Sequence, residues 1–134
     1  MAEVIPHGVY ERGRRLATSL AEHTTAVVLL HGDLTPVNIV DGGPRRGLVA
    51  LDPAPCLGDA GFDTVDLLFW QAADEATIAA RATRLAAAIG VDGEGLLDWC
   101  VAFAGMIALE LAASSDTPED RIHAYLNLAL QAPG

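Results

Sequence analysis

The segment LLHGDLTPVNIV, residues 29–40, places one histidine, one carboxylate and one amide between two apolar runs. A further carboxylate, Asp52, ends the run GLVALD at residues 47–52. A carboxylate can orient an attacking hydroxyl group and accept its proton, while amide and carboxylate oxygens can hold Mg²⁺ on nucleotide phosphates. Asp33 suits the first role, and Asn38 with Asp52 suits the second. These residue types therefore indicate phosphoryl transfer.

Two short strand-like runs, residues 37–40 and 47–52, are separated by DGGPRR, a sequence rich in turn formers, so they predict a β-hairpin. Paired strands lie about 5 Å apart, so a hairpin would return Asp52 to the side of Asn38. Taken singly, Asp33, Asn38 and Asp52 could be ordinary turn residues, because Asp and Asn form local hydrogen bonds in turns. The functional interpretation depends on the three as a spaced set.

The surrounding segments predict the elements that would position these residues. AVVLL at residues 26–30 predicts a buried strand that leads into the motif. DPAPCLGDAG at residues 52–61 contains two prolines and two glycines and predicts a loop. Helical periodicity extends over most of the rest, at residues 8–22, 62–73, 75–89 and 94–113 and in a last helix through Leu130.

Capping signals support two of these helix boundaries. Gly90 is a suitable C-terminal cap, and Thr117 is the expected N-cap of the last helix, with Pro118 in its first turn. The predicted fold is α+β and mostly helical, in a single domain of residues 1–134. Within it we expect a leading helix (1–25), catalytic and metal-binding loops with a hairpin (26–61) and a helical subdomain (62–134).

Composition narrows the classes of function. The 134 residues carry a formal net charge of -10, and Lys and Arg total only 8, which argues against nucleic-acid binding. The N-terminus has no apolar region of the kind that a secretory signal needs. No apolar stretch is expected to span a bilayer, so the chain is predicted to be cytoplasmic. An acidic surface attracts cations, including metal ions and amine-rich substrates, although acidity can also serve solubility alone.

Four residues are expected in apolar surroundings. Cys56 and Cys100 show no metal-binding spacing and have apolar neighbours in the sequence, which is typical of reduced structural thiols. Trp70 and Trp99 fall on apolar helical faces and are expected in the core.

The joint pattern LHGDLTPVNIV…LVALDPAPCLGDAGFDTVDLLF resembles the aminoglycoside phosphotransferase family of the protein-kinase-like fold. The Asp-Pro run and the phrase LGDAGFD are most similar to the aminoglycoside 6-phosphotransferase branch, the streptomycin and hydroxyurea kinases. The resemblance is strong from Leu29 to Trp70 and looser toward the C-terminus. The tripeptide HGD alone would be weak evidence for this family, since it is common in turns.

The resemblance implies a role for each motif residue. Asp33 would be the catalytic base, and Asn38 and Asp52 would bind Mg²⁺, with ATP as phosphate donor and a cationic aminoglycoside as acceptor. His31 would hold the loop through backbone hydrogen bonds, and Asp63 would brace the loop from below. Two further observations concern neighbouring positions. The family often has Lys at the position of Ala54 and His at the position of Thr35. Asp59 is a weaker candidate for binding the substrate.

The resemblance covers the C-terminal lobe of that fold. The chain contains no lysine and no phosphate-covering glycine loop, so we expect the N-terminal lobe to be absent from these 134 residues. A truncated gene product, a fragment and one half of a split enzyme would all fit. The isolated chain is expected to be folded but inactive. The alternatives are a non-catalytic module that binds a partner or forms a homodimer, and a kinase for another small alcohol.

Overall fold

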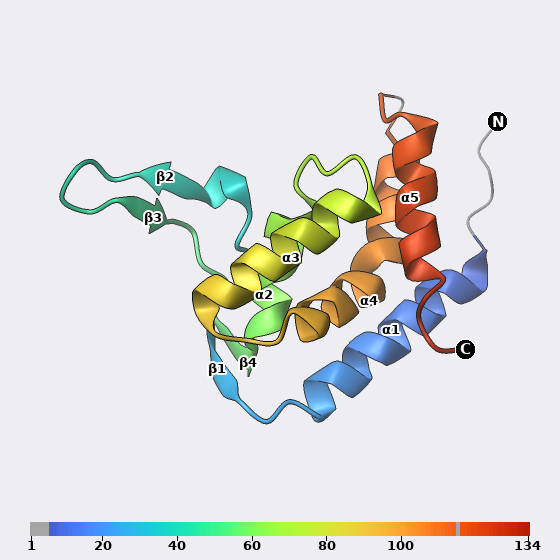
Figure 1. The fold of residues 1–134 in the computed structure, drawn as a ribbon, viewed down its shortest axis with the longest axis horizontal. Helices are drawn as coiled ribbons and strands as arrows, with labels where there is room; N and C mark the ends of the chain where they lie inside the picture. The colour runs from blue at the N-terminus through green and yellow to red at the C-terminus, as the bar shows by residue number, and fades with distance from the viewer. Residues whose placement is uncertain (1–5, 115) are drawn as a thin grey trace.

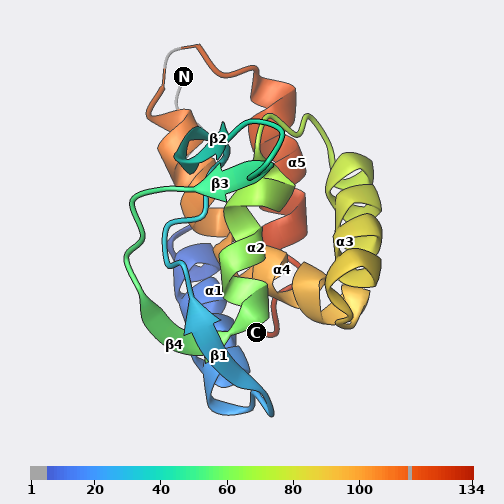
Figure 2. The ribbon, with the colours of Figure 1, turned by 90° about the vertical axis from the view of Figure 1, so that its left-hand side faces the viewer.

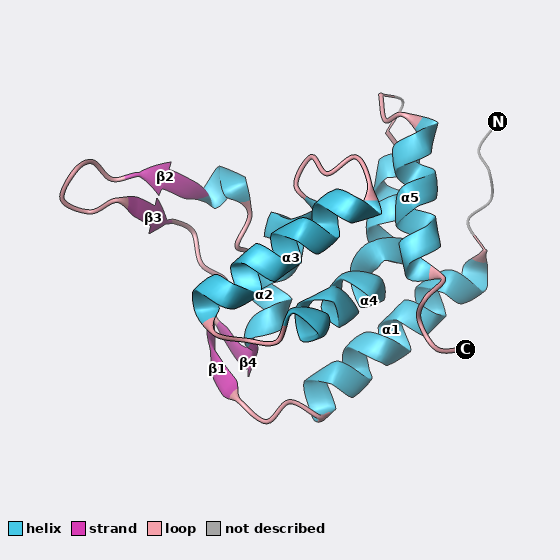
Figure 3. Cartoon of the chain, viewed as in Figure 1, coloured by secondary structure: helices cyan, strands magenta, loops and turns pink. Residues whose placement is uncertain are grey.

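The computed structural model of the chain describes residues 6–114 and 116–134. Within these residues, five α-helices form one body, and two small antiparallel pairs of strands lie at one end of it (Figure 1, Figure 3). The helices are α1 (His7–Glu22), α2 (Ala60–Phe69), α3 (Glu75–Ile89), α4 (Gly93–Ala112) and α5 (Glu119–Ala129). The strands are β1 (Val27–Leu30), β2 (Ile39–Asp41), β3 (Leu48–Ala50) and β4 (Cys56–Asp59), and a 3₁₀ turn, η1 (Pro36–Asn38), precedes β2. The predicted α+β, mostly helical class is confirmed.

Helix α4 forms the centre of the helical body and packs against α1, α2, α3 and α5. Its buried residues include Leu96, Trp99, Cys100 and Ala104. The 20 residues of this helix, with a mean hydropathy of 1.6, are long and apolar enough to cross a membrane by composition alone, contrary to the sequence-based expectation. A helix that is covered on several sides by other helices is apolar for that reason, so the composition of α4 follows from its central position.

Helix α1 crosses α4 at a point where the two backbones come close together. A Cβ atom added to Gly13 would lie 3.4 Å from the carbonyl carbon of Ala102 and nearer still to its oxygen. Nearby, a Cβ atom on Gly105 would lie 2.9 Å from Cγ1 of Val9. The two glycines therefore permit a close approach that any side chain would prevent.

The carboxyl end of α2 is held by side chains from two other helices. The Tyr125 hydroxyl, in a residue that is 1% exposed, lies 2.6 Å from the carbonyl oxygen of Ala72 and 3.2 Å from that of Phe69. Arg81 donates to the carbonyl oxygen of Leu68 at 3.1 Å. The last carbonyls of a helix have no intrahelical donor, so these contacts satisfy them and fix the position of α2.

Strand β4 corrects the prediction of a loop over residues 52–61. Residues Cys56–Asp59 pair antiparallel with β1, with Val27 opposite Asp59 and Leu30 opposite Cys56. Pro53 and Pro55 precede the paired residues, and the ladder hydrogen bonds come from β1, a partner distant in the sequence. Local turn signals cannot report such a partner.

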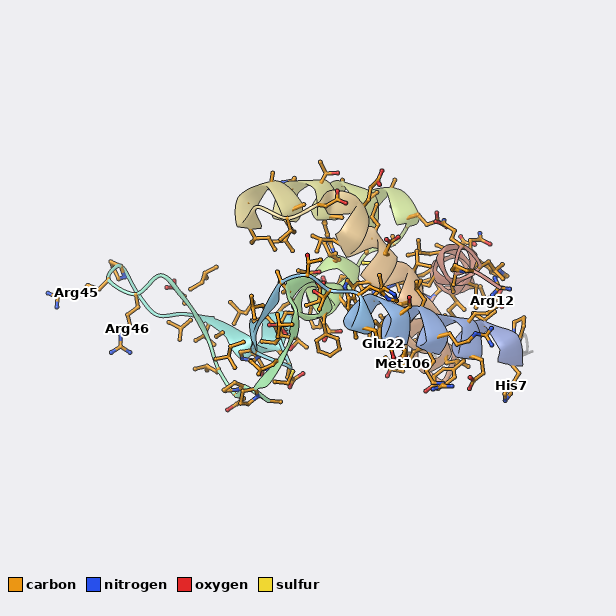
Figure 4. All side chains as sticks on the ribbon, turned by 90° about the horizontal axis from the view of Figure 1, so that it is seen from below. His7, Arg12, Glu22, Arg45, Arg46 and Met106 are labelled. Carbon is orange, nitrogen blue, oxygen red and sulfur yellow. The ribbon has the colours of Figure 1, made fainter. Side chains whose placement is uncertain are left out.

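The predicted hairpin is present as β2 and β3, with Ile39 opposite Ala50 and Asp41 opposite Leu48. It projects away from the helices (Figure 1). Arg45 and Arg46 lie at its tip and point away from the body of the molecule (Figure 4).

Most predicted helix boundaries lie close to the observed ones. The exceptions are the end of α2 and the N-cap of α5. Gly90 caps α3 with φ 74°, as predicted. Thr117 is not the N-cap of α5: Pro118 occupies that position, and no side chain there accepts a capping hydrogen bond. Helix α2 begins at Ala60 and ends at Phe69, four residues before the predicted end at residue 73, and Gln71 has φ 50°. A residue with positive φ cannot continue an α-helix, which explains the early end.

Two of the four residues expected in apolar surroundings lie elsewhere. Cys100 is buried and Trp99 is 5% exposed, as predicted. Cys56 is exposed, and Trp70 is 41% exposed. Cys56 lies on the strand that the loop prediction missed, where its apolar sequence neighbours do not bury it. Trp70 follows the last residue of α2, so it is not on the helical face that the periodicity suggested.

Candidate active site

The HGD loop, residues 31–38, connects β1 to β2 beside α2 (Figure 2). The His31 ring lies between two backbone groups of opposite character. Its Nε2 is 2.8 Å from the carbonyl oxygen of Leu51, and its Nδ1 is 3.2 Å from the amide nitrogen of Asp33. A carbonyl can only accept and an amide N–H can only donate, so the ring carries its proton on Nε2. The neutral imidazole thus ties the loop to the residue that follows β3.

Asp63, in the first turn of α2, holds the loop from the other side. Its Oδ2 accepts a hydrogen bond from the amide of His31 at 2.7 Å, and its Oδ1 accepts one from the amide of Gly32 at 3.0 Å. Gly32 has φ 87°, and an added Cβ atom would lie 2.7 Å from the carbonyl carbon of Ala54. Only glycine fits this close turn without displacing the chain. Charged hydrogen bonds from one carboxylate therefore fix two consecutive peptide groups immediately before Asp33.

Asp33 and Asn38 are brought together within the loop. The Asn38 Nδ2 group donates to the carbonyl oxygen of Asp33 at 2.9 Å and to its carboxylate Oδ2 at 3.2 Å. Both acceptors require the amide NH₂, so the orientation of the Asn38 side chain is fixed and its Oδ1 is left for another partner. The Asp33 side chain is exposed to solvent, as a group that meets a substrate must be.

The hairpin brings Asp52 close to Asn38 along the backbone. Beyond the last paired residues of β2 and β3, the amide of Leu51 donates to the carbonyl oxygen of Asn38 at 2.7 Å. Asp52 is the next residue and has φ 51°, in the left-handed region that Asp adopts more readily than most residues. The described residues contain no group of three or more His, Cys, Asp or Glu side chains that could hold a metal ion. Mg²⁺ commonly uses one or two protein carboxylates together with water and substrate phosphates, and the free Oδ1 of Asn38 beside Asp52 is compatible with such a site.

A further carboxylate near this site was not among the residues predicted from the sequence. Asp66, one turn after Asp63 on α2, has a raised pKa because protein surrounds its carboxyl group and because Asp33 and Glu110 are negatively charged neighbours. The Asp66 side chain is exposed to solvent, which screens its interactions with the neighbouring carboxylates. It lines a cavity of about 170 Å³ together with Gly32, Asp63 and apolar residues of α4. The spacing of three residues from Asp63 was the available signal, because such residues share one side of a helix.

Asp59 lies at the other end of the β1–β4 ladder. It is opposite Val27, whereas the HGD loop follows Leu30. Its Oδ1 accepts from the amide of Gly61 at 2.7 Å and caps α2, and its Oδ2 accepts from the Thr24 hydroxyl at 2.7 Å. The structure therefore does not bring Asp59 together with Asp33, Asn38 and Asp52.

Comparison with known families assigns the chain. Residues 2–114 match the family model of the aminoglycoside/hydroxyurea antibiotic resistance kinase. The match covers most of the chain and contains the whole HGD loop, the hairpin and the first turn of α2. The chain belongs to this family. No curated protein and no solved structure matches it.

Membership of the aminoglycoside/hydroxyurea antibiotic resistance kinase family confirms the resemblance found in the sequence. The family is one of transferases that are kinases and are linked to antibiotic resistance. This agrees with the chemistry that Asp33, Asn38 and Asp52 suggest by their types and spacing.

Proposed function

We propose that this chain is the acceptor-side part of an ATP-dependent phosphotransferase that modifies a hydroxyl group of a small molecule, an aminoglycoside antibiotic such as streptomycin. The observation that carries the proposal is the geometry of the HGD loop. Asp63 and His31 fix its backbone, and Asn38 binds the carbonyl oxygen and the carboxylate of Asp33. Residues 1–134 act in this proposal as one lobe, in the cytoplasm, where ATP is available.

The reaction assigns one task to Asp33. The acceptor hydroxyl oxygen forms a bond to the γ-phosphorus of ATP as the bond from that phosphorus to the bridging oxygen breaks, and ADP leaves. Asp33 orients the hydroxyl group and accepts its proton. The Asn38 amide, by donating to Oδ2 of Asp33, holds the carboxylate in one orientation toward the acceptor.

Mg²⁺ fits the same site. The free Oδ1 of Asn38 and the carboxylate of Asp52 are the residues that would hold it. The ion would supply positive charge to the phosphate oxygens of the nucleotide. The protein contributes the fixed positions of these two ligands, through the β2–β3 pairing and the Asn38–Asp33 hydrogen bonds.

The choice of acceptor rests on charge. The chain has a net charge of -10, Asp66 adds a carboxylate near Asp33, and Glu110 adds one near Asp66, which favours an amine-rich acceptor. A kinase for another small alcohol would use the same loop, because acceptor choice depends on the surrounding loops and helices and not on the HGD motif.

We also propose that these 134 residues alone do not turn over. They contain no lysine and no phosphate-covering loop, so nothing among them fixes the nucleotide phosphates from above. Misalignment of about 1 Å can cost on the order of a hundredfold in rate.

A second candidate function is supported by apolar side chains on the strands and on η1. Several of them are strongly exposed, namely Val27, Leu29, Val37, Leu48 and Leu57. Apolar surface of this kind favours an interface with another protein, either a nucleotide-binding lobe or a second copy of the chain. In this case the chain would serve as a partner-binding module.

The test of the phosphotransferase proposal uses the chain co-expressed with a nucleotide-binding lobe of the same family. ADP release is followed with Mg²⁺, ATP and streptomycin. Asp33→Asn is expected to lower kcat by about a hundredfold to ten-thousandfold, the usual contribution of a general base. Asp74→Asn, an N-cap substitution on α3, serves as the matched control and should leave kcat unchanged. Wild-type turnover by Asp33→Asn would refute the assignment of the base, and turnover by the chain without the lobe would refute the proposed inactivity.

A further inference from the structure

A second cavity, of about 690 Å³, lies away from the HGD loop. It is formed by the end of α1, the start of β1, the end of β4 with the first turn of α2, and the turn between α3 and α4. On the β1–β4 ladder it lies at the end where Val27 is opposite Asp59, whereas the HGD loop leaves the other end. Its volume is within the range of about 300–1,000 Å³ that is usual for small-molecule sites.

Apolar residues form much of the cavity. Leu96 and Trp99, from α4, are buried in its floor. Val28, from β1, and Ile89 and Val91, from the end of α3 and the turn that follows it, line the cavity and are exposed large aliphatic side chains. These exposed aliphatic side chains line one cavity. They therefore form an apolar surface that the apolar part of a ligand can bury.

Two carboxylates give the cavity a negative charge. Asp59 and Asp92 both line it, and neither forms a salt bridge with any residue of the described chain. Their hydrogen bonds come from neutral groups: Asp59 accepts from the Thr24 hydroxyl and the Gly61 amide, and Asp92 accepts from the Glu94 amide at 3.3 Å. Among the described residues that line the cavity there is no arginine, and the basic side chain there is that of His23; the chain contains no lysine. The charge of the two carboxylates is therefore available to a cationic ligand.

The indole of Trp99 adds a polar group without a partner. Trp99 is 5% exposed, and its N–H finds no acceptor in residues 6–114 and 116–134. Its Cδ1–Nε1 edge lies against Gly61, where an added Cβ atom would be 2.8 Å from Nε1, and both residues line the cavity. Stacking on Phe103, with ring centroids 6.2 Å apart, and an edge contact with Phe62 fix the plane of the ring. The N–H group at this edge can donate to a ligand oxygen, which would fix the ligand against the Trp99 ring.

We propose that this cavity is a binding site for a small organic amine that carries an apolar body and an ether or hydroxyl oxygen. Its ammonium group lies between Asp59 and Asp92, its apolar body contacts Val28, Ile89 and Val91, and its oxygen accepts from Trp99. This site is separate from the phosphotransfer site, because the β1–β4 ladder lies between them. The proposal does not depend on the proposed phosphotransferase function, and its test measures binding alone.

The test uses 4-methoxyphenethylamine as the probe and 4-methoxyphenethyl alcohol as its neutral counterpart. Trp70→Phe, at an exposed position outside the cavity, leaves Trp99 as the single indole, so the chemical shift of its Nε1–H group reports on the site directly. Measurements are made at about pH 8, where histidine is neutral. The amine is expected to shift this resonance saturably and to bind at least about fivefold more tightly than the alcohol, since a hydrogen bond to a charged group exceeds a neutral one.

Three matched N-cap variants test where the ammonium group of the probe binds. Asp59→Asn and Asp92→Asn remove charge inside the cavity, and Asp74→Asn removes it on α3, outside the cavity. Asn is as good an N-cap as Asp, so the helices are retained, which thermal melting by circular dichroism verifies. Asp59→Asn and Asp92→Asn should each weaken binding of the amine about fivefold and leave binding of the alcohol unchanged. Asp74→Asn should change the affinity for neither compound. No saturable shift, equal affinity for amine and alcohol, or equal weakening by Asp74→Asn would overturn the proposal.

Discussion

Asp63 shows how one side chain can fix the direction of a whole loop. The resemblance implied that it braces the HGD loop, and its two carboxylate oxygens indeed accept from the amides of His31 and Gly32. The placement of Asn38 beside Asp33 was likewise accessible from their spacing within one loop. The spacing places Asp66 on the same side of α2 as Asp63, but its approach to Asp33 depends on how α2 packs beside the loop, and the local sequence does not report that packing. The catalytic roles of these residues remain predictions.

The raised pKa of Asp66 predicts a pH-dependent effect of Asp66→Asn on stability. Burial of the carboxyl group and the charges of Asp33 and Glu110 disfavour its ionised form in the folded chain. Between its ordinary pKa of 3.8 and the raised value, the folded state binds more protons than the unfolded state. Stability of the wild-type chain therefore falls as pH rises through this window. Asp66→Asn removes that loss, so urea denaturation should show a larger stabilising effect at about pH 7 than near pH 4.

Asp74 supplies the control for this prediction, because its pKa shift has the opposite sign. Hydrogen bonds from the hydroxyl and the amide of Thr77 lower the pKa of Asp74. Its stabilising contribution is present above the ordinary pKa and is lost as pH falls through the lowered value. Any destabilisation by Asp74→Asn should accordingly be larger at about pH 7 than at low pH. The same pH trend in both variants would contradict the charge explanation.

Among the helices and strands, the sequence predicted best those elements that are specified by residues within or directly beside them. Helix α3 extends from Glu75 to Ile89 as predicted, because its alanine-rich periodicity and the Gly90 cap that directly follows it are both local signals. Strand β4 was missed, because its hydrogen bonds come from β1, about 30 residues earlier in the chain, and two prolines precede it. The N-cap of α5 was misplaced for a related reason: Thr117 and Pro118 fit the capping pattern, but the chain enters the helix one residue later.

The crossing of α1 and α4 yields a prediction about packing. Gly13→Ala would drive a Cβ atom into the carbonyl group of Ala102 on α4. Since backbone cannot move aside as a side chain does, we expect a destabilisation of about 1–3 kcal/mol, typical of overpacking. Gly8→Ala is the matched control on the same helix, because no heavy atom lies within 4 Å of the added Cβ.

The control should be neutral or slightly stabilising, by up to about 1 kcal/mol, since alanine reduces the entropy of the unfolded chain. Urea denaturation of the two variants measures both effects. Equal stability of the two variants would show that α1 and α4 do not approach as closely as described.

The whole molecule places the HGD loop on the same side as the exposed apolar side chains of its strands. The HGD loop, the β2–β3 hairpin and the β1–β4 pair all lie at one end of the helical body, and the start of α1 and the C-terminus lie at the opposite side (Figure 1). A two-stranded sheet is marginally stable in water and has unpaired edges. The strand side of the molecule is therefore where we expect another protein surface to bind, next to the loop that carries Asp33.

Leu29 and Leu57 allow this expectation to be tested. They are directly opposite each other on β1 and β4, and both are 74% exposed. Leu29→Thr combined with Leu57→Thr retains strand-forming residues and removes apolar surface that the folded chain does not bury, so its stability should stay within about 0.5 kcal/mol of wild type. If the strands bind a partner, the wild-type chain should self-associate at high concentration in the absence of that partner, and the double variant should shift toward monomer in sedimentation velocity. Leu109→Gln removes an exposed leucine from α4 and should leave self-association unchanged. A wild-type chain that stays monomeric at all concentrations, or a loss of association in Leu109→Gln alone, would rule out the strands as the interface.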